Sequence, residues 1–458
     1  MTVLEVTRIA HDLRGVAHAD GSTWFVEGAL PGEQVSASVL MRRSQLVDAV
    51  AVDVIANPSP DRVKPSCEYS GRCGGCALQH VDSAAQVRLK QQVLLDQLQR
   101  LGRIAPHAVL SPLVVEPWAY RRRARFACKW SSDRKHLAFG LRERHSERIV
   151  EVEHCAVLLP ALEALVRPLR AVLSGWSQPR LLGHVECLSG DNGVAILVRL
   201  LGEPSCSDYG LLREFSRNSN TSIFLKVGGT QSEDQSPTVF FCGKEAVIEY
   251  AHEPTQTHVA CFPGDFVQGN EAVNRQLTDA VLESLQTEIT DTVLEAFCGL
   301  GNFTFPLARR VQRITALELS NTMLARAKRQ ADALAVDNIH WHASNLDRFS
   351  TQEKSCSPVN KILLDPPREG AQDFCKSVSL QGVCRLVYVS CNPSTLARDA
   401  AILAERGFLM ESVRIVDMFP QTNHIEAIAV FVPDTMAGKK ITANKKQAVK
   451  NSERKLRR

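Results

Sequence analysis

The sequence has no uninterrupted run of about 18 apolar residues, the length that a membrane-spanning helix needs. Residues 1–12 also lack the basic and then apolar pattern of a secretory signal. Glycine and proline, 26 and 21 of 458 residues, stay near average usage, which excludes a collagen-like chain and argues against a wholly disordered one. These absences predict a folded, cytoplasmic protein with no membrane partner.

The length of 458 residues exceeds what one hydrophobic core supports and predicts about three domains. The net charge of +4 is unevenly distributed, because residues 437–458 hold nine Lys or Arg and one acid. The rest of the chain is therefore close to −4. A basic end of this kind is typical of a disordered tail, and contact with nucleic acid is the alternative.

Residues 1–56 are predicted to form a small closed β-barrel, because short strands and turns alternate at close spacing. The expected strands are 3–6, 15–18, 24–26, 33–39 and 46–55. A proline-containing linker at 57–65 and a cysteine cluster come next, and apolar spacing predicts a helix over 83–101. Later strands at 120–130, 149–152, 184–200, 221–227 and 239–250 predict a mostly β central domain over 57–260.

Residues 261–436 change to strands that alternate with helices. Strands are expected at 292–297, 314–319, 361–364 and 385–389, with helices at 303–311 and 322–334. This order predicts a Rossmann-like, doubly wound parallel sheet that binds ligands at the carboxyl ends of its strands.

The first strand of that sheet runs into the turn Cys298-Gly299-Leu300-Gly301. Glycines at such a turn let the backbone approach a nucleotide-like ligand, and Glu318 at the end of the next strand can bind ribose hydroxyls. A tight corner without a ligand is the plain alternative. The third glycine of the dinucleotide fingerprint is missing, which disfavours NAD.

Two more strands end in chemically active residues. Asp365 precedes two prolines, which force a fixed turn, although a merely rigid loop is the alternative. Cys391 in Ser-Cys-Asn-Pro follows another strand at the same edge, where it is either a nucleophile or a packing thiol. His424 and Glu426 stand two apart at the entry of a last strand.

These four pieces, in this order, resemble the RNA uracil-C5 methyltransferase family. Leu30-Pro31-Gly32-Glu33 resembles part of a TRAM domain, an RNA-binding barrel. Together with the barrel and the cysteine cluster, the resemblance extends over the whole chain and is to the 23S ribosomal RNA enzymes, since the related transfer-RNA enzyme lacks both parts. It implies Cys391 as nucleophile and Glu426 as base. It also implies contacts to S-adenosylmethionine from Gln268, Phe297, Asn302, Glu318, Asn345 and Asp365.

The implied chemistry requires these residue types. Uracil C5 is a weak nucleophile, so a thiolate must first add to C6, and a carboxylate must later remove the C5 proton. The product is 5-methyluridine. The target base must also leave its stack, so a single-stranded or loop segment of 23S rRNA is the expected partner of a monomeric enzyme.

The cysteine cluster consists of Cys67, Cys73, Cys76 and, far along the chain, Cys155. Four thiolates suit either a [4Fe-4S] cluster or zinc, with His80 or His154 as substitute zinc ligands, and the resemblance implies iron-sulfur. The nearby strand 120–126 places Arg121, Arg123 and Arg125 on one face, where they either contact phosphates or are simply solvated.

The sequence argues against three other functions. A radical enzyme would need a Cys-x3-Cys-x2-Cys loop, whereas this sequence has five residues between Cys67 and Cys73. A cytosine-C5 methyltransferase would carry a second catalytic cysteine where Asp365 stands. A non-enzymatic RNA-binding protein would not need the thiol, the carboxylate and the glycine turn together.

Overall fold

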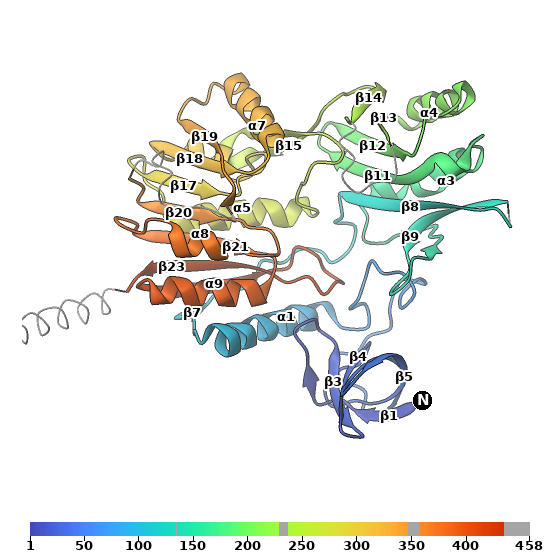
Figure 1. The fold of residues 1–458 in the computed structure, drawn as a ribbon, viewed down its shortest axis with the longest axis horizontal. Coiled ribbons are helices and arrows are strands. Elements are labelled where there is room, and N and C mark those ends of the chain that lie inside the picture. Colours follow the sequence, from blue (N-terminus) through green and yellow to red (C-terminus); the bar gives the residue numbers. More distant parts are fainter. Residues whose placement is uncertain (134, 229–236, 347–357, 435–458) are drawn as a thin grey trace, which may run out of the picture. The chain divides into compact units, whose positions relative to one another are not determined.

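The computed structural model describes residues 1–133, 135–228, 237–346 and 358–434. The chain divides into two compact units, whose elements are labelled in Figure 1. The first unit consists of Met1–Val93, Val114–Gln276 and Asp417–His424, and the second of Leu94–Leu113, Leu277–Val416 and Ile425–Arg458. The predicted basic tail at 437–458 lies outside the described residues.

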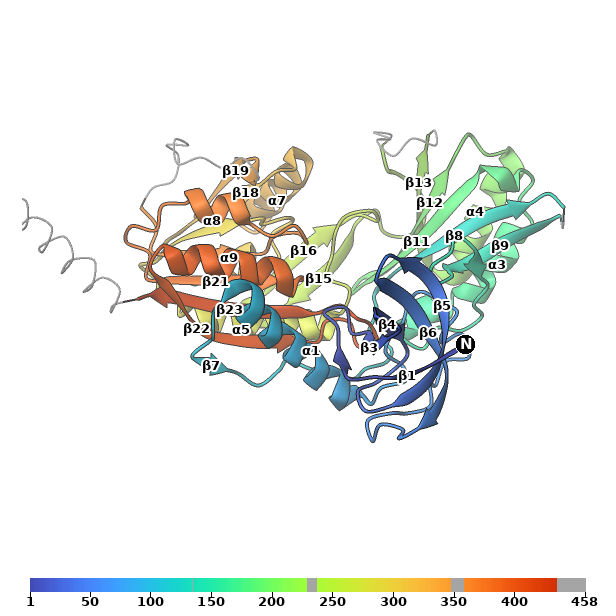
Figure 2. The same ribbon diagram turned by 60° about the horizontal axis from the view of Figure 1, so that its bottom comes forward.

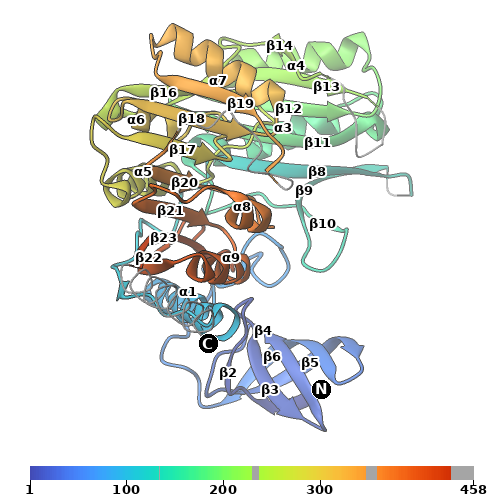
Figure 3. The same ribbon diagram turned by 60° about the vertical axis from the view of Figure 1, so that its left-hand side comes forward.

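The first unit begins with a six-stranded sheet in the order β1-β5-β6-β4-β3-β2. Its strands are β1 Thr2–Glu5, β2 Arg8–Ile9, β3 Gly15–Ala19, β4 Ser22–Glu27, β5 Gln34–Arg43 and β6 Leu46–Ala56. The two ends of this order, β1 and β2, are consecutive in the chain, so the sheet curls round on itself (Figure 3). Its core is built on the buried Trp24, Val26, Val35 and Val47.

The centre of the first unit is a seven-stranded sheet in the order β10-β9-β8-β11-β12-β13-β14. Its strands are β8 Arg123–Ser131, β9 His136–Arg142, β10 Ile149–Val150, β11 Leu182–Gly190, β12 Gly193–Leu200, β13 Thr221–Val227 and β14 Val239–Cys242. Leucines of the helices α3 Val166–Ser174 and α4 Cys206–Ser219 join its hydrophobic core. Helix α2 Pro160–Glu163 and the hairpin β15 Ile248–His252 and β16 Thr257–Cys261 complete this part.

The segment Asp417–His424 is held inside the first unit by buried polar groups. The Nζ atom of Lys90 lies 2.7 Å from Oδ1 of Asp417, and the lysine side chain is fully buried. The side-chain amide of Gln86 donates to Oε1 of Gln421 at 2.9 Å and accepts from its backbone N–H at 2.8 Å. These contacts tie the segment to helix α1, Ser83–Gln97.

The second unit is built on an eight-stranded sheet in the order β19-β18-β17-β20-β21-β23-β22-β7. Its strands are β17 Thr292–Ala296, β18 Arg313–Glu318, β19 Ile339–Ala343, β20 Lys361–Leu364, β21 Arg385–Ser390, β22 Phe408–Val416, β23 Glu426–Pro433 and β7 Ala108–Val109. The helices are α5 Glu271–Leu285, which starts in the first unit, α6 Thr304–Ala308, α7 Asn321–Ala333, α8 Gln372–Ser377 and α9 Pro393–Glu405. Figure 2 shows α8 and α9 over one face of this sheet.

The expected mixture of α/β and β architecture is confirmed, with two differences in detail. The eight-stranded sheet of the second unit is not purely parallel, because β23 runs antiparallel to both β21 and β22. Only a short loop joins β22 to β23, and a parallel pair would need a longer crossover. The helix expected over 83–101 becomes a π-helix at Leu98–Gly102, where a Cβ on Gly102 would lie 2.7 Å from the carbonyl oxygen of Ala397.

Local sequence patterns did not predict every helix. The helices α3 and α4 were missed, although Ser205 and Asp208 form a capping box that starts α4. In the described residues, no helix is long and apolar enough to cross a membrane.

Candidate functional site

The predicted cofactor residues of the second unit gather at one edge of its sheet. Phe297 follows β17, Glu318 ends β18, Asn345 comes two residues after β19, and Asp365 follows β20. These four strands are parallel neighbours, so their carboxyl ends meet at the same edge (Figure 3). Asn302 lies in the turn after β17.

The glycine turn is shaped by Glu318. One carboxylate oxygen accepts the backbone N–H of Gly299 at 3.1 Å, and the other accepts that of Ser320 at 2.9 Å. Gly299 and Gly301 both have positive φ, and a Cβ on Gly301 would lie 2.6 Å from the ring of Phe305. The turn therefore requires glycine.

The loop that follows Asp365 is held by the start of α9. The side-chain amide of Asn392 donates to the carbonyl oxygen of Arg368 at 3.0 Å, and its oxygen caps the helix by accepting the N–H of Ser394. The buried carboxylate of Asp399 accepts from Ala371 N–H at 2.7 Å. The Asp-Pro-Pro loop and the Ser-Cys-Asn-Pro loop thus form one rigid structure.

The strand register brings Cys391 and Glu426 together. Ser390 at the end of β21 pairs with Ala427 of the antiparallel strand β23. The next residue on each strand toward that edge is Cys391 and Glu426, which therefore stand opposite each other. Directly opposite residues have Cβ atoms about 5 Å apart, close enough for their side chains to interact.

Burial and nearby charges raise the pKa of the Cys391 thiol from 9.0 to about 11. Burial is the largest cause, followed by the carboxylates of Glu426 and Asp365, while Arg368 opposes them. The thiol is therefore protonated in the free protein at neutral pH. Its attack on a substrate requires that a base accept the proton as the new bond forms.

Glu295 is a buried acid beside the candidate site. It lies on β17 and is 2% exposed, and among the described residues its Oε2 atom has no hydrogen-bond partner. Burial raises the pKa of Glu295 to about 8, with a smaller contribution from Asp365, whose own pKa burial raises to about 7. These two strands therefore carry neighbouring carboxyl groups that titrate near neutral pH.

Gln268 is the one predicted cofactor residue that belongs to the first unit. It lies in the loop between β16 and α5. There the backbone N–H of Arg122 donates to the carbonyl oxygen of Gly269 at 2.9 Å. Gly269 also packs against Phe419, because a Cβ on this glycine would lie 2.6 Å from the ring.

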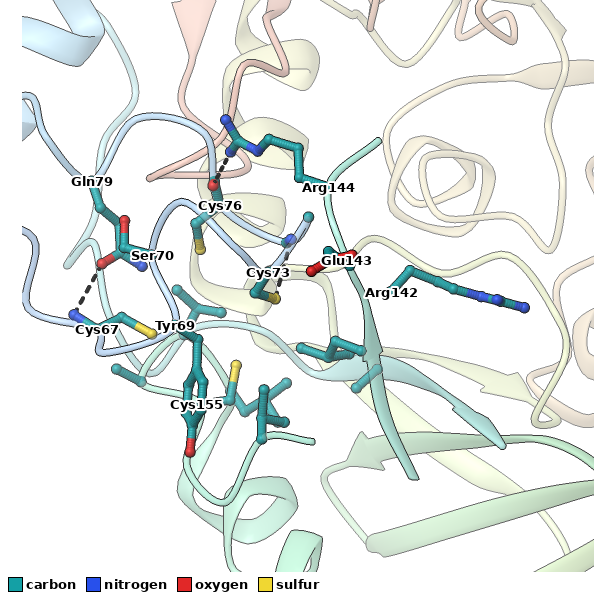
Figure 4. A pocket seen from close by; sticks show the side chains of 18 of the residues that line it. Cys67, Tyr69, Ser70, Cys73, Cys76, Gln79, Arg142, Glu143, Arg144 and Cys155 are labelled. Atoms are coloured by element: carbon teal, nitrogen blue, oxygen red, sulfur yellow. Dashed lines mark hydrogen bonds between the residues drawn. The ribbon is translucent and has the colours of Figure 1, made fainter. Parts of the chain in front are cut away.

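The first unit brings the four predicted metal ligands to one cavity of ≈ 510 Å³. Figure 4 shows the sulfur atoms of Cys67, Cys73, Cys76 and Cys155 facing a common space. Burial raises the pKa of Cys73 and Cys76, and that of Cys155 to about 12.

The cysteine loop is fixed from several sides. Gly74 N–H donates to the carbonyl oxygen of Arg142 at 2.9 Å, and Arg144 donates to the carbonyl oxygen of Cys76. Arg144 also pairs with Glu27 of β4 at 2.9 Å, which joins the loop to the N-terminal sheet. Sequence patterns gave no sign of this link between three distant segments.

In the part of the chain that the structure describes, no three His, Cys, Asp or Glu residues are grouped closely enough to hold one ion. His154 lines the cavity but pairs with Glu163 at 2.9 Å, and His80 is not among the lining residues.

The chain is similar to known proteins along most of its length. The model of the tRNA (Uracil-5-)-methyltransferase family matches residues 253–433. A 23S rRNA (uracil(1939)-C(5))-methyltransferase RlmD of Pseudomonas fluorescens is 40% identical over 430 residues, 93% of either chain. The enzyme of the same name from Pasteurella multocida is 38% identical over 94% of this chain and 95% of its own length.

A solved structure shares the fold. The Pyrococcus abyssi tRNA (uracil-54, C5)-methyltransferase, in complex with S-adenosyl-L-homocysteine, superimposes with a TM-score of 0.73 at 22% identity. The match covers 94% of this chain and all of that one. The chain belongs to the RNA uracil-C5 methyltransferase family. Within that family, its full-length similarity is to the enzymes named RlmD.

Proposed function

We propose that this protein transfers a methyl group from S-adenosylmethionine to C5 of a uridine in 23S rRNA, at the position equivalent to uracil 1939 of its relatives. The opposition of Cys391 and Glu426 across β21 and β23 is the observation that carries the proposal. Their side chains lie on the same face of the sheet, and a thiol and a carboxylate side by side can reach C6 and C5 of one base, as the reaction requires.

The reaction begins at Cys391. Its thiol loses a proton as the sulfur adds to C6 of uracil, and the C5–C6 π electrons move to form an enolate. Asp365, whose charge also acts on the thiol, can accept this proton, which leaves Glu426 ionised for the later step. C5 then becomes nucleophilic enough to take a methyl group.

S-adenosylmethionine supplies that methyl group as an electrophilic carbon on a sulfonium. Phe297, Asn302, Glu318, Asn345 and Asp365 are the residues of the second unit proposed to hold it, and Gln268 of the first unit stays a predicted contact. The carboxylate of Glu318 is anchored by two backbone N–H groups, which suits the binding of ribose hydroxyls.

Glu426 completes the cycle as the proposed base. It removes the proton from C5 of the methylated adduct, the C5–C6 double bond forms again, and the sulfur of Cys391 leaves C6. The uridine must be turned out of its stack to reach the sheet edge, which favours a single-stranded or loop target.

We also propose that Cys67, Cys73, Cys76 and Cys155 hold a [4Fe-4S] cluster. Each thiolate of such a cluster binds a different iron, so the sulfurs stand farther apart than around one zinc ion. The four thiols line one cavity, and the family resemblance favours iron-sulfur over zinc. The cluster would stabilise the fold, because no step above requires an electron.

The remaining parts are assigned as predictions. We take residues 1–56 as a TRAM barrel that binds RNA, 57–260 as the iron-sulfur domain and 261–436 as the methyltransferase domain. A monomeric state and a location in the cytoplasm also stay predictions.

Methyl transfer to isolated 23S rRNA tests the proposed function. The protein, with S-adenosylmethionine labelled in the methyl group, should form one 5-methyluridine per 23S rRNA taken from cells that lack the enzyme. Cys391→Ala should abolish the reaction, and Cys384→Ala, which removes an exposed thiol from the same unit, should not. Labelling of transfer RNA instead of 23S rRNA would contradict the proposed substrate.

Removal of one cluster thiol tests the metal assignment. Cys155→Ala should lose iron and thermal stability together, whereas Cys206→Ala, an exposed thiol in the same unit, should keep both. A wild-type protein that binds zinc and no iron after anaerobic reconstitution would contradict the assignment.

A further inference from the structure

A short segment, residues 119–122, is hydrogen-bonded to the chain that follows the predicted ligand Cys155. The N–H of Arg121 donates to the carbonyl oxygen of Val157 at 2.8 Å, and the carbonyl oxygen of Arg121 accepts the N–H of Leu159 at 3.0 Å. One side of the segment is therefore attached to the chain that lines the cysteine cavity.

The other side of the segment is attached to the loop that contains Gln268. The N–H of Arg122 donates to the carbonyl oxygen of Gly269 at 2.9 Å, and Arg121 forms an antiparallel β-bridge with Asn270. All of these residues belong to the first unit. The backbone thus joins the cysteine cavity to the Gln268 loop through one short segment.

The side chain of Arg121 makes the same connection. It lines the cavity together with the four cysteines. Its guanidinium carbon lies 5.9 Å from the centre of the Phe419 ring, within the range of a cation–π interaction. A Cβ on Gly269 would lie 2.6 Å from that ring, so Phe419 packs directly on the residue after Gln268.

The charge of Arg121 lacks the kind of partner that Arg144 has in the same cavity. Arg144 pairs with Glu27 at 2.9 Å. Arg121 is half-buried, and no carboxylate of the described residues pairs with it. Burial raises the pKa of Cys73 and Cys76, and the charge of Arg121 acts against this effect on both thiols. Thiolates that bind a metal are negatively charged, so they supply a counter-charge for this arginine.

We infer, on the basis of the proposed function, that Arg121 is a positioning residue that connects the metal centre, through Phe419, to the backbone at Gln268. The metal-bound thiolates attract the guanidinium, the guanidinium holds the aromatic ring, and the ring restricts the movement of Gly269. Bound metal therefore supports the predicted contact to S-adenosylmethionine without any redox step.

Amide hydrogen exchange, followed by mass spectrometry of peptides from the full-length protein, tests this connection. The peptide 266–274 reports on the loop, and the peptide 46–56 of β6 is the internal reference. Wild type loaded with iron is compared with wild type after treatment with an iron chelator, and with iron-loaded Arg121→Gln and Phe419→Leu. Arg142→Gln is the matched control, because Arg142 also lines the cavity but its side chain points away from the cysteines (Figure 4).

Loss of iron, Arg121→Gln and Phe419→Leu should each speed exchange in the loop peptide by about tenfold, the order expected for a cation–π contact at a partly buried site. Phe419→Leu should keep its iron. Removing that iron should then change the loop less than it does in wild type, because the connection is already broken. The reference peptide and Arg142→Gln should match wild type.

Binding of S-adenosylmethionine by the same proteins shows whether the loop matters for the cofactor. Arg121→Gln should bind it about tenfold more weakly than wild type. The double variant Arg121→Gln with Gln268→Ala should bind no more weakly than Gln268→Ala alone, because two substitutions that act on one contact are not additive.

Equal exchange of the loop with and without iron, in protein that stays folded, would overturn the inference. If the chelator unfolds the protein, iron-loaded Phe419→Leu with wild-type loop exchange would overturn it instead. Weaker RNA binding by Arg121→Gln with wild-type loop exchange would make this residue a phosphate contact and would also overturn it.

Two results would instead bear on the proposed function. A wild type that binds no iron would remove the proposed cluster, and the inference with it. A Gln268→Ala variant that binds S-adenosylmethionine as tightly as wild type would remove only the predicted cofactor contact, and the exchange of the loop would still decide whether Arg121 connects it to the metal.

Discussion

Substitution of Glu426 should abolish methyl transfer and at the same time make the thiol of Cys391 more reactive. The pKa of this thiol is raised from 9.0 to about 11 by burial and then by Glu426 and Asp365. At pH 7 only about one thiol in 10,000 is then ionised, against about one in 100 at the ordinary value. Glu426→Gln removes the first of the two charges, so the pKa should fall.

The assay is alkylation by iodoacetamide in the absence of RNA, between pH 6.5 and 9.5. Because the sequence has 14 cysteines, modification of Cys391 is followed by mass spectrometry of its own peptide. A fall of one pKa unit would give about tenfold faster alkylation at any pH below the pKa. Methyl transfer should fall sharply in the same variant, since the C5 proton has lost its acceptor.

Glu405→Gln provides the matched control, because this exposed carboxylate at the end of α9 belongs to the same unit. It should change neither rate. Alkylation of Cys391 at the wild-type rate in Glu426→Gln would show that the two side chains do not face each other, and would refute the argument from strand register.

Three further predictions concern stability. Lys90→Met should lower the free energy of unfolding by about 3 to 5 kcal/mol in urea denaturation, because it leaves Asp417 buried without its partner. Adding Asp417→Leu should restore most of the lost stability, and a double variant as unstable as Lys90→Met would contradict the prediction. Glu295 has a raised pKa, so it should cost the wild type stability as the pH rises from about 4.5 toward about 8, and Glu295→Gln should lose less over this range. Melting curves at pH 5 and 8 check whether the advantage of the variant grows by up to about 1.4 kcal/mol per pH unit. Glu33, which is fully buried against Arg62, has a lowered pKa, so its stabilising effect should be present at neutral pH and disappear on acidification. Unfolding of wild type and Glu33→Gln at the same acid pH would contradict this prediction.

Local patterns were enough to predict the strand ends that form the candidate site. Phe297, Asp365 and Cys391 each follow a buried strand, and parallel strands end at a common edge, so their grouping follows from the order of elements. The glycine turn was also predicted, but not the contact that helps to shape it, in which the N–H of Gly299 donates to the carboxylate of Glu318.

Contacts between distant segments could not be predicted in this way. The opposition of Cys391 and Glu426 depends on β23 entering between β21 and β22, which no periodicity reveals. The same holds for the link from Arg144 to Glu27 and Cys76. The contact of His184 Nδ1 with Arg125 Nη2, at 3.1 Å, depends on a one-residue bulge after Leu182, and a strict alternation of faces would have placed His184 on the wrong side.

The measurement that tests the central claim most directly is the trapping of the covalent adduct. A 23S rRNA fragment with 5-fluorouridine at the target position cannot lose fluorine as a proton, so the final elimination stops. The account predicts a denaturation-resistant complex that requires S-adenosylmethionine for the methylated form, with the RNA attached to the peptide containing Cys391. An adduct on any other cysteine, or one that persists in Cys391→Ala, would contradict it.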